Sequence, residues 1–296
     1  MPPRIAIPMP HSTDHEYGER AILQYERAVA QAGGEPVRIP LDQPPAELMK
    51  LIHRCDGVLL PGSNADVDPA KFGATRSPHT ATADPRRDAV DELLLRDAYR
   101  LHKPVLGICY GLQSLNVYRA GSLIQHIPDF LPEELRTRVN HEAGRKVAVA
   151  HSVEIDRRSK LAKIVDGIVD GKDLEEHGLG LEPALSKRSA PKGADTTAKG
   201  NRALAPGGTK LVVPVNSSHH QSAGTIGSGL RIVARCPDDG IVEALEGTAP
   251  DHFVLAVQWH PERSVDQDEP SRAIFRALIE AANIEATIEA AKTRHK

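Results

Sequence analysis

The sequence predicts an α/β fold: an open, mostly parallel sheet with helices on both faces and some antiparallel strands in the second half of the chain. Short apolar runs, such as residues 57–60, 105–108 and 254–257, are typical of parallel strands that are covered on both faces. Between them lie longer segments, such as residues 16–32 and 84–101, in which apolar side chains recur at helical spacing. This alternation of the two patterns favours a layered α/β domain.

The first half of the chain is predicted to hold strands at residues 4–8, 37–39, 57–61 and 105–108, and helices at 16–32, 46–53, 84–101 and 112–118. Asp84 and Pro85 form a good helix start, with Asp as the N-cap and Pro in the first turn. We expect Arg87, Asp88 and Glu92 on the solvated face of that helix.

The second half is predicted to hold strands at residues 147–149, 152–155, 211–215, 230–234, 241–245 and 254–257, and a C-terminal helix from Asp268 to about residue 291. The first two of these segments alternate apolar and other residues, as edge strands do.

All 296 residues are expected to form one domain, interrupted by a low-complexity insertion at about residues 166–209. The first part of this segment is acidic, and the second is basic and rich in glycine. Its second part has too few large apolar side chains to bury much surface, so we expect it to be mobile. Two interpretations remain open for it: a passive surface loop, and a lid or interface element that precedes the strand at 211–215.

The composition excludes several classes of partner. A net charge of −3 gives no reason to expect nucleic acid or an anionic membrane. The first residues lack the apolar core of a signal peptide, and no apolar run reaches membrane length. Three widely spaced cysteines argue against a disulfide framework, and Cys55 and Cys236 are interpreted as structural. We therefore expect a cytoplasmic protein, and a homodimer remains open.

The third cysteine lies in a pattern typical of a nucleophile. Residues 107–111 read GICYG, with Cys109 between two glycines at the end of a predicted strand and before a predicted helix. Glycines at these positions allow the sharp strand-to-helix turn that raises a nucleophile above a sheet. The N-terminus of the following helix favours a thiolate there.

A second strand end supplies the partners that a cysteine nucleophile needs. Residues 258–262 read QWHPE directly after the strand at 254–257. His260 is a candidate base, and Glu262 is a candidate acceptor that fixes the tautomer of the imidazole. Open parallel sheets place their sites at the carboxyl ends of strands, where both segments lie. The sequence therefore predicts a Cys-His-Glu triad.

Together these motifs resemble those of the class I glutamine amidotransferase superfamily, whose sheet is flavodoxin-like. Residues 215–221 (VNSSHHQ) and 237–244 (PDDGIVEA) resemble its gamma-glutamyl-gamma-aminobutyrate hydrolase branch. The resemblance covers roughly residues 4–160 and 210–282. It implies a cysteine-dependent hydrolase, active in polyamine catabolism, that cleaves the γ-glutamyl amide bond of a small γ-glutamyl amine through a glutamyl thioester.

The resemblance also implies roles for further residues. Backbone N–H groups of Tyr110 and of the loop at Gly62 and Ser63 would form the oxyanion hole. The remaining substrate contacts are expected at Gln113, Ser218, His219 and His220. By the same resemblance, Asp88 and Glu92 would help to frame the pocket.

No cofactor or metal is expected for the reaction. Adjacent histidines such as His219 and His220 point in opposite directions in extended backbone and are a poor pair of ligands.

Two alternatives remain. The first is a glutaminase subunit that delivers ammonia to a synthase partner, because Tyr110 follows the nucleophile as in many amidotransferases, where the hydrolases often have Arg. The second is a non-catalytic relative, which the intact Cys109, His260 and Glu262 disfavour.

Overall fold

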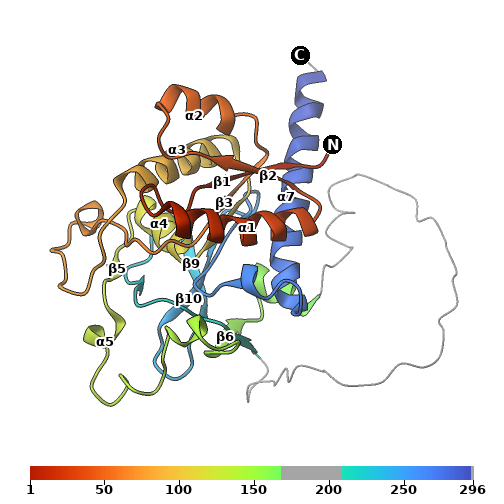
Figure 1. Cartoon of the computed structure of the whole chain (residues 1–296). Helices are drawn as coiled ribbons and strands as arrows, with labels where there is room; N and C mark the ends of the chain where they lie inside the picture. The colour runs from red at the N-terminus through yellow and green to blue at the C-terminus, as the bar shows by residue number, and fades with distance from the viewer. Residues whose placement is uncertain (168–208, 295–296) are drawn as a thin grey trace, which may run out of the picture.

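A nine-stranded sheet forms the centre of the computed structural model, which describes residues 1–167 and 209–294 (Figure 1). The strand order is β2-β1-β3-β4-β11-β10-β9-β6-β7. The first five strands run parallel to one another: β2 (Glu35–Ile39), β1 (Arg4–Pro8), β3 (Gly57–Leu60), β4 (Val105–Ile108) and β11 (Val254–Val257). The predicted α/β fold is confirmed.

The remaining strands pair antiparallel: β10 (Val242–Gly247), β9 (Leu230–Arg235), β6 (His151–Asp156) and β7 (Lys210–Val215). All of them come from the second half of the chain, as the sequence predicted. A separate two-stranded ladder joins β5 (Leu123–Ile124) to β8 (Ser222–Ala223).

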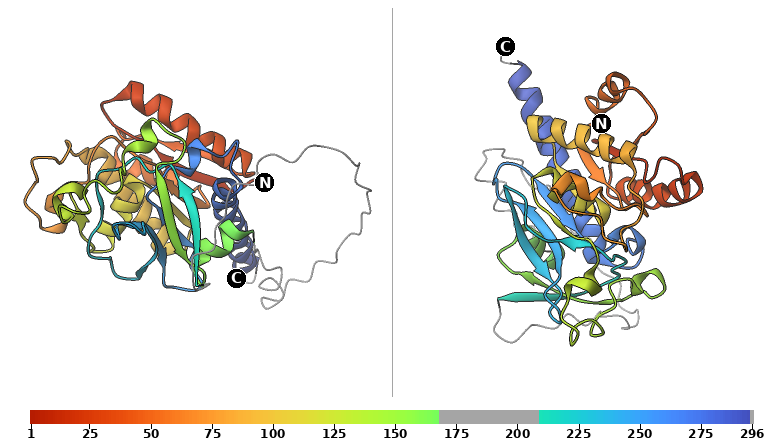
Figure 2. Two further views of the ribbon diagram at one scale, coloured as in Figure 1. Left: turned by 90° about the horizontal axis from the view of Figure 1, so that it is seen from below. Right: turned by 90° about the vertical axis from the view of Figure 1, so that its left-hand side faces the viewer.

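Helices cover both faces of the sheet, because each central strand sends alternate side chains to opposite sides. On β1, Ile5 and Ile7 pack into one core and Ala6 into the other. The first core is closed by α1 (His15–Gln31), α6 (Lys160–Asp166) and α7 (Glu269–Arg294), and Figure 2 shows α6 beside α7. The second core is closed by α2 (Pro45–Ile52), α3 (Pro85–Leu101) and α4 (Tyr110–Tyr118).

Short helical turns complete the described chain: α5 (Ile127–Phe130), η1 (Pro69–Phe72), η2 (Ala143–Arg145) and η3 (Pro261–Arg263). The predicted start of α3 is confirmed, since the Asp84 side chain accepts hydrogen bonds from the N–H groups of Arg86 and Arg87. No helix within residues 1–167 or 209–294 is long and apolar enough to span a membrane. The low-complexity insertion predicted at about 166–209 lies, apart from its ends, outside the described residues.

The strand predicted at residues 147–149 is wrong. Val147 and Val149 are about half exposed, and the antiparallel ladder begins only at His151. The backbone just before this segment bonds to a loop instead, since the Gly144 N–H donates to the Ser217 carbonyl over 2.8 Å. Alternation over three residues is too short a pattern to distinguish a strand from an exposed loop.

The expectation of a solvated face at Arg87 and Asp88 is also wrong. Both residues are buried, and the Arg87 guanidinium donates to Asp91 over 2.7 Å and to the Pro61 carbonyl over 2.8 Å. A buried guanidinium needs such partners, and here they tie α3 to the loop that follows β3. Glu92 is exposed, as expected.

Candidate active site

Cys109 occupies a strained turn between β4 and α4. Its backbone angles are φ 53° and ψ −104°, a region that side chains other than glycine rarely adopt. A Cβ atom at Gly111 would lie 2.1 Å from the Leu60 carbonyl oxygen, and one at Gly107 would lie 2.8 Å from the Gly111 carbonyl oxygen. The two flanking glycines therefore permit the close contact of strand and helix that the nucleophile elbow requires.

The triad residues lie in hydrogen-bonding order. His260 Nδ1 donates to Glu262 Oε1 over 2.7 Å, and the other side of the imidazole forms a hydrogen bond with Cys109. Glu262 is 1% exposed, so its carboxylate has little access to solvent. Asn216 fixes the backbone of His260 from both directions: its amide donates to the His260 carbonyl over 2.8 Å and accepts from the His260 N–H over 2.9 Å.

The charges of the pair support each other. Burial by itself disfavours a charged imidazole, but the negative charges of Glu262 and Cys109 outweigh burial and raise the pKa of His260 to about 9. Burial likewise opposes ionisation of Glu262, and the His260 charge outweighs it and lowers the pKa of the carboxyl. The arrangement thus favours an imidazolium–carboxylate pair beside the thiol.

The loop after β3 lies against the triad. A Cβ atom at Gly62 would come within 3.0 Å of His260 Cε1 and 3.0 Å of the Tyr25 hydroxyl. The Gly62 N–H already donates to that hydroxyl over 3.0 Å. The N–H groups of Ser63 and Tyr110 have no such acceptor among the described residues. Glycine at position 62 therefore lets the loop approach the nucleophile closely.

A cavity of about 590 Å³ opens above Cys109. It brings together seven residues predicted from the sequence: Ser63, Cys109, Gln113, Ser218, His219, His220 and His260. Gly62 and Glu262 lie directly behind this surface, in contact with His260. The structure thus gathers the predicted residues, apart from the Tyr110 side chain, around one cavity.

The Tyr110 side chain points away from that cavity. Its hydroxyl donates to Asp88 over 2.5 Å, and its ring lies 4.7 Å from the Arg87 guanidinium carbon. Asp88 and Glu92 line a different, smaller cavity on that side, so they do not frame the predicted pocket. The kind of side chain at position 110 therefore has no direct contact with the space above Cys109.

Sequence reasoning missed the charged lining of the main cavity. Asp66 lies 3.1 Å from His220, and Arg145 pairs with Glu142 over 3.2 Å. These residues come from loops, without a strand end or a motif to mark them. Both charge signs are thereby present beside the nucleophile.

The layered sheet, the elbow cysteine and the His-Glu pair at the neighbouring strand define a class I glutamine amidotransferase-like protein. The chain belongs to the family described as Peptidase C26, whose model matches residues 5–173 and 189–262. The resemblance noted in the sequence is thereby confirmed.

Among its relatives is the gamma-glutamyl-gamma-aminobutyrate hydrolase of Escherichia coli (strain K12), 32% identical over 262 residues that cover 87% of this chain and 84% of the relative. A glutamine amidotransferase-like protein of Rickettsia prowazekii is 30% identical over 267 residues, with 87% of each chain covered. The family and these relatives support an amide hydrolase of the γ-glutamyl type.

Solved structures show the same fold at low identity. A crystal structure of a Thermoplasma acidophilum protein named for GMP synthase matches with a TM-score of 0.54 and 14% identity, covering 98% of both chains. This likeness concerns the fold alone.

Proposed function

We propose that this protein hydrolyses the γ-glutamyl amide bond of a small γ-glutamyl amine, such as γ-glutamyl-γ-aminobutyrate. The observation that carries the proposal is the Cys109–His260–Glu262 chain at the floor of the 590 Å³ cavity. A nucleophile, a base in contact with it and a carboxylate that orients the base are the parts that acyl transfer needs. The hydrolase relative of 32% identity supports the same substrate class.

In the first half-reaction, the Cys109 thiolate attacks the γ-carbonyl carbon of the substrate. The developing oxyanion would accept hydrogen bonds from the backbone N–H groups of Ser63 and Tyr110, since the Gly62 N–H is engaged by Tyr25. The His260 imidazolium then gives its proton to the departing amine. The C–N bond breaks, and a glutamyl thioester remains on Cys109.

In the second half-reaction, neutral His260 takes a proton from water, which attacks the thioester carbon. The C–S bond breaks, glutamate leaves, and the thiolate–imidazolium pair is restored. Glu262 stays ionised throughout and holds the imidazole by its Nδ1–H.

The cavity lining suits the α-amino and α-carboxylate groups of a glutamyl moiety. Asp66 and Glu142 supply negative charge for an ammonium group, and Arg145 supplies positive charge for a carboxylate. Ser218 and His220 lie in the same lining, on the loop that the sequence motif marks.

The deciding experiment measures glutamate release by the purified protein alone. Three kinds of substrate are compared: γ-glutamyl-γ-aminobutyrate, other γ-glutamyl amines and free glutamine. We expect release from γ-glutamyl amines without a partner, and the Cys109→Ala variant supplies the background rate. Turnover of glutamine only, or no turnover until a partner is added, would instead identify a glutaminase subunit. The Tyr110 side chain gives that alternative little support, because it lies outside the cavity.

The pH dependence tests the role of His260. Its pKa is raised from an ordinary 6.5 to about 9, so the imidazole keeps its proton through neutral pH and loses it as the pH rises past about 9. We expect kcat/KM for a γ-glutamyl amide to fall on this alkaline limb, because neutral His260 cannot protonate the leaving amine. Replacing Glu262 with glutamine removes the main charge that raises this pKa, and should move the limb to lower pH. A limb at the same pH in both proteins would contradict the assignment.

A further inference from the structure

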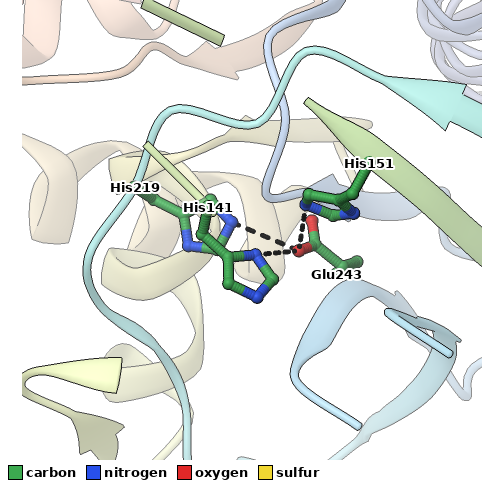
Figure 3. A group of neighbouring side chains, drawn as sticks. All are labelled: His141, His151, His219 and Glu243. Carbon is green, nitrogen blue, oxygen red and sulfur yellow. Dashed lines mark hydrogen bonds and ion pairs between the residues drawn. The ribbon is translucent and has the colours of Figure 1, made fainter. Parts of the chain in front are cut away.

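A cluster of buried histidines surrounds one carboxylate beside the cavity wall. His141, His151 and His219 point at Glu243, as Figure 3 shows. Their ring nitrogens lie 3.0, 3.3 and 3.2 Å from the same oxygen, Glu243 Oε1. All four side chains are at most 4% exposed. The triad does not use any of them.

The hydrogen bonds on the outer side of each ring determine what faces inward. His141 Nε2 lies 2.8 Å from an Asp239 carboxylate oxygen, His151 Nδ1 lies 3.0 Å from the Ser152 carbonyl, and His219 Nδ1 lies 2.8 Å from the Gln221 carbonyl. These partners are pure acceptors, so each outer nitrogen must carry the proton. In the neutral ring the inner nitrogen then presents a lone pair.

Three lone pairs and a carboxylate oxygen would therefore meet in a space closed to solvent. In agreement with this, His141 Nδ1 and His151 Nε2 are buried and have no hydrogen-bond partner within the described part of the chain. Such an arrangement is stable only if a positive charge lies between the four atoms, as additional protons or as a cation. Histidines that donate outward to a carboxylate or a carbonyl while the other nitrogen faces inward are the usual surroundings of a bound metal ion.

We propose that His141, His151, His219 and Glu243 bind one divalent transition-metal ion of the zinc type. The four candidate ligand atoms lie within 4.8 Å of one another. In a tetrahedral zinc site with bonds of about 2.0–2.1 Å, neighbouring ligand atoms are about 3.4 Å apart. The observed separations of 3.0–3.3 Å from Glu243 Oε1 are close to that geometry.

The ligand set indicates a structural role. Four protein ligands leave no open position, which is the mark of a structural zinc site. The ligands come from β6, from β10, from the segment before η2 and from the loop after β7. The ion would thus fasten the loop that carries Ser218 and His220, and the turn that carries Arg145, to the sheet. His219 takes part without its neighbour His220, which instead faces Asp66.

The test titrates metal-free protein with Co²⁺ and follows the visible absorption of a tetrahedral complex, then displaces cobalt with Zn²⁺ to obtain the affinity. It uses the Cys109→Ala background, so that the catalytic thiol cannot bind the ion and the result does not depend on the proposed activity. We expect one equivalent per chain. Zn²⁺ should also raise the thermal unfolding midpoint of this protein, because it binds only the folded chain.

Matched variants locate the site. His151→Gln and Glu243→Gln should weaken zinc binding by about 100-fold or more, since loss of even an outer partner costs about 10–100-fold. His252→Gln is the control, because His252 is a buried histidine that bonds to the Lys103 carbonyl, far from these ligands in the hydrogen-bond network. It should keep the affinity.

Absence of cobalt binding by the folded protein would overturn the proposal and leave protons as the cluster's positive charge. Equal binding by the ligand variants would overturn it too. If the variants do not fold, the stoichiometry, the tetrahedral spectrum and the zinc-induced shift of the unmutated cluster still decide the question.

Discussion

Replacing Cys109 with alanine should lower the rate of γ-glutamyl amide hydrolysis by about 10⁴-fold or more, because removal of a triad nucleophile eliminates the covalent route. The fold should be unchanged. Alanine keeps the Cβ atom and loses only the sulfur, and the strained φ of 53° is no harder for alanine than for cysteine. The γ-glutamyl substrate should therefore still bind, since the charged lining of the cavity is intact. Steady-state kinetics and calorimetric binding measure the two effects separately.

Cys55→Ala is the matched control. Cys55 is buried behind α2, away from the cavity, and burial raises the pKa of its thiol to about 11. Its replacement should leave turnover unchanged. Iodoacetamide should inactivate the native protein and the Cys55→Ala variant at the same rate, with one modified residue found by mass spectrometry, at Cys109. Substantial hydrolysis by Cys109→Ala would show that another group performs the chemistry.

The triad could be predicted because its chemistry imposes local sequence rules. An elbow that brings a strand into contact with a helix excludes side chains at Gly107 and Gly111, so the glycines are visible in the sequence. The His260–Glu262 bond joins residues two apart, and a spacing of this kind can be read without knowing the fold. The alternation of buried strands and amphipathic helices indicated the layers in the same way.

The rest of the site depends on contacts between distant segments. Arg87 looks like an ordinary surface arginine until the carbonyls of Pro10 and Pro61 are found around it. His141 and His151 have no pattern that links them to Glu243, because a loop and two different strands bring them together. Only the His219 motif is visible in the sequence, where it indicates a substrate contact. Sequence spacing cannot reveal partners that meet through tertiary structure alone.

Gly111→Ala should destabilise the protein by about 3 kcal/mol or more, at the upper end of what overpacking usually costs. The added methyl group would lie 2.1 Å from the Leu60 carbonyl oxygen, and backbone atoms of a central strand cannot move aside as a flexible side chain can. Relief requires β3 and α4 to separate, which would also displace Cys109 from His260. We therefore expect a lower thermal unfolding midpoint and a loss of activity at temperatures where the variant is still folded.

Gly18→Ala supplies a control of opposite sign. Gly18 lies inside α1, and its added methyl group would meet its nearest atom, the His11 carbonyl oxygen, at an ordinary 3.5 Å. Because alanine is the better helix former by about 0.5–1 kcal/mol, this variant should be as stable as the native protein or more stable. Equal unfolding midpoints for the two variants would mean that the clash at Gly111 is relieved without separating strand from helix, and that the tight elbow does not require glycine.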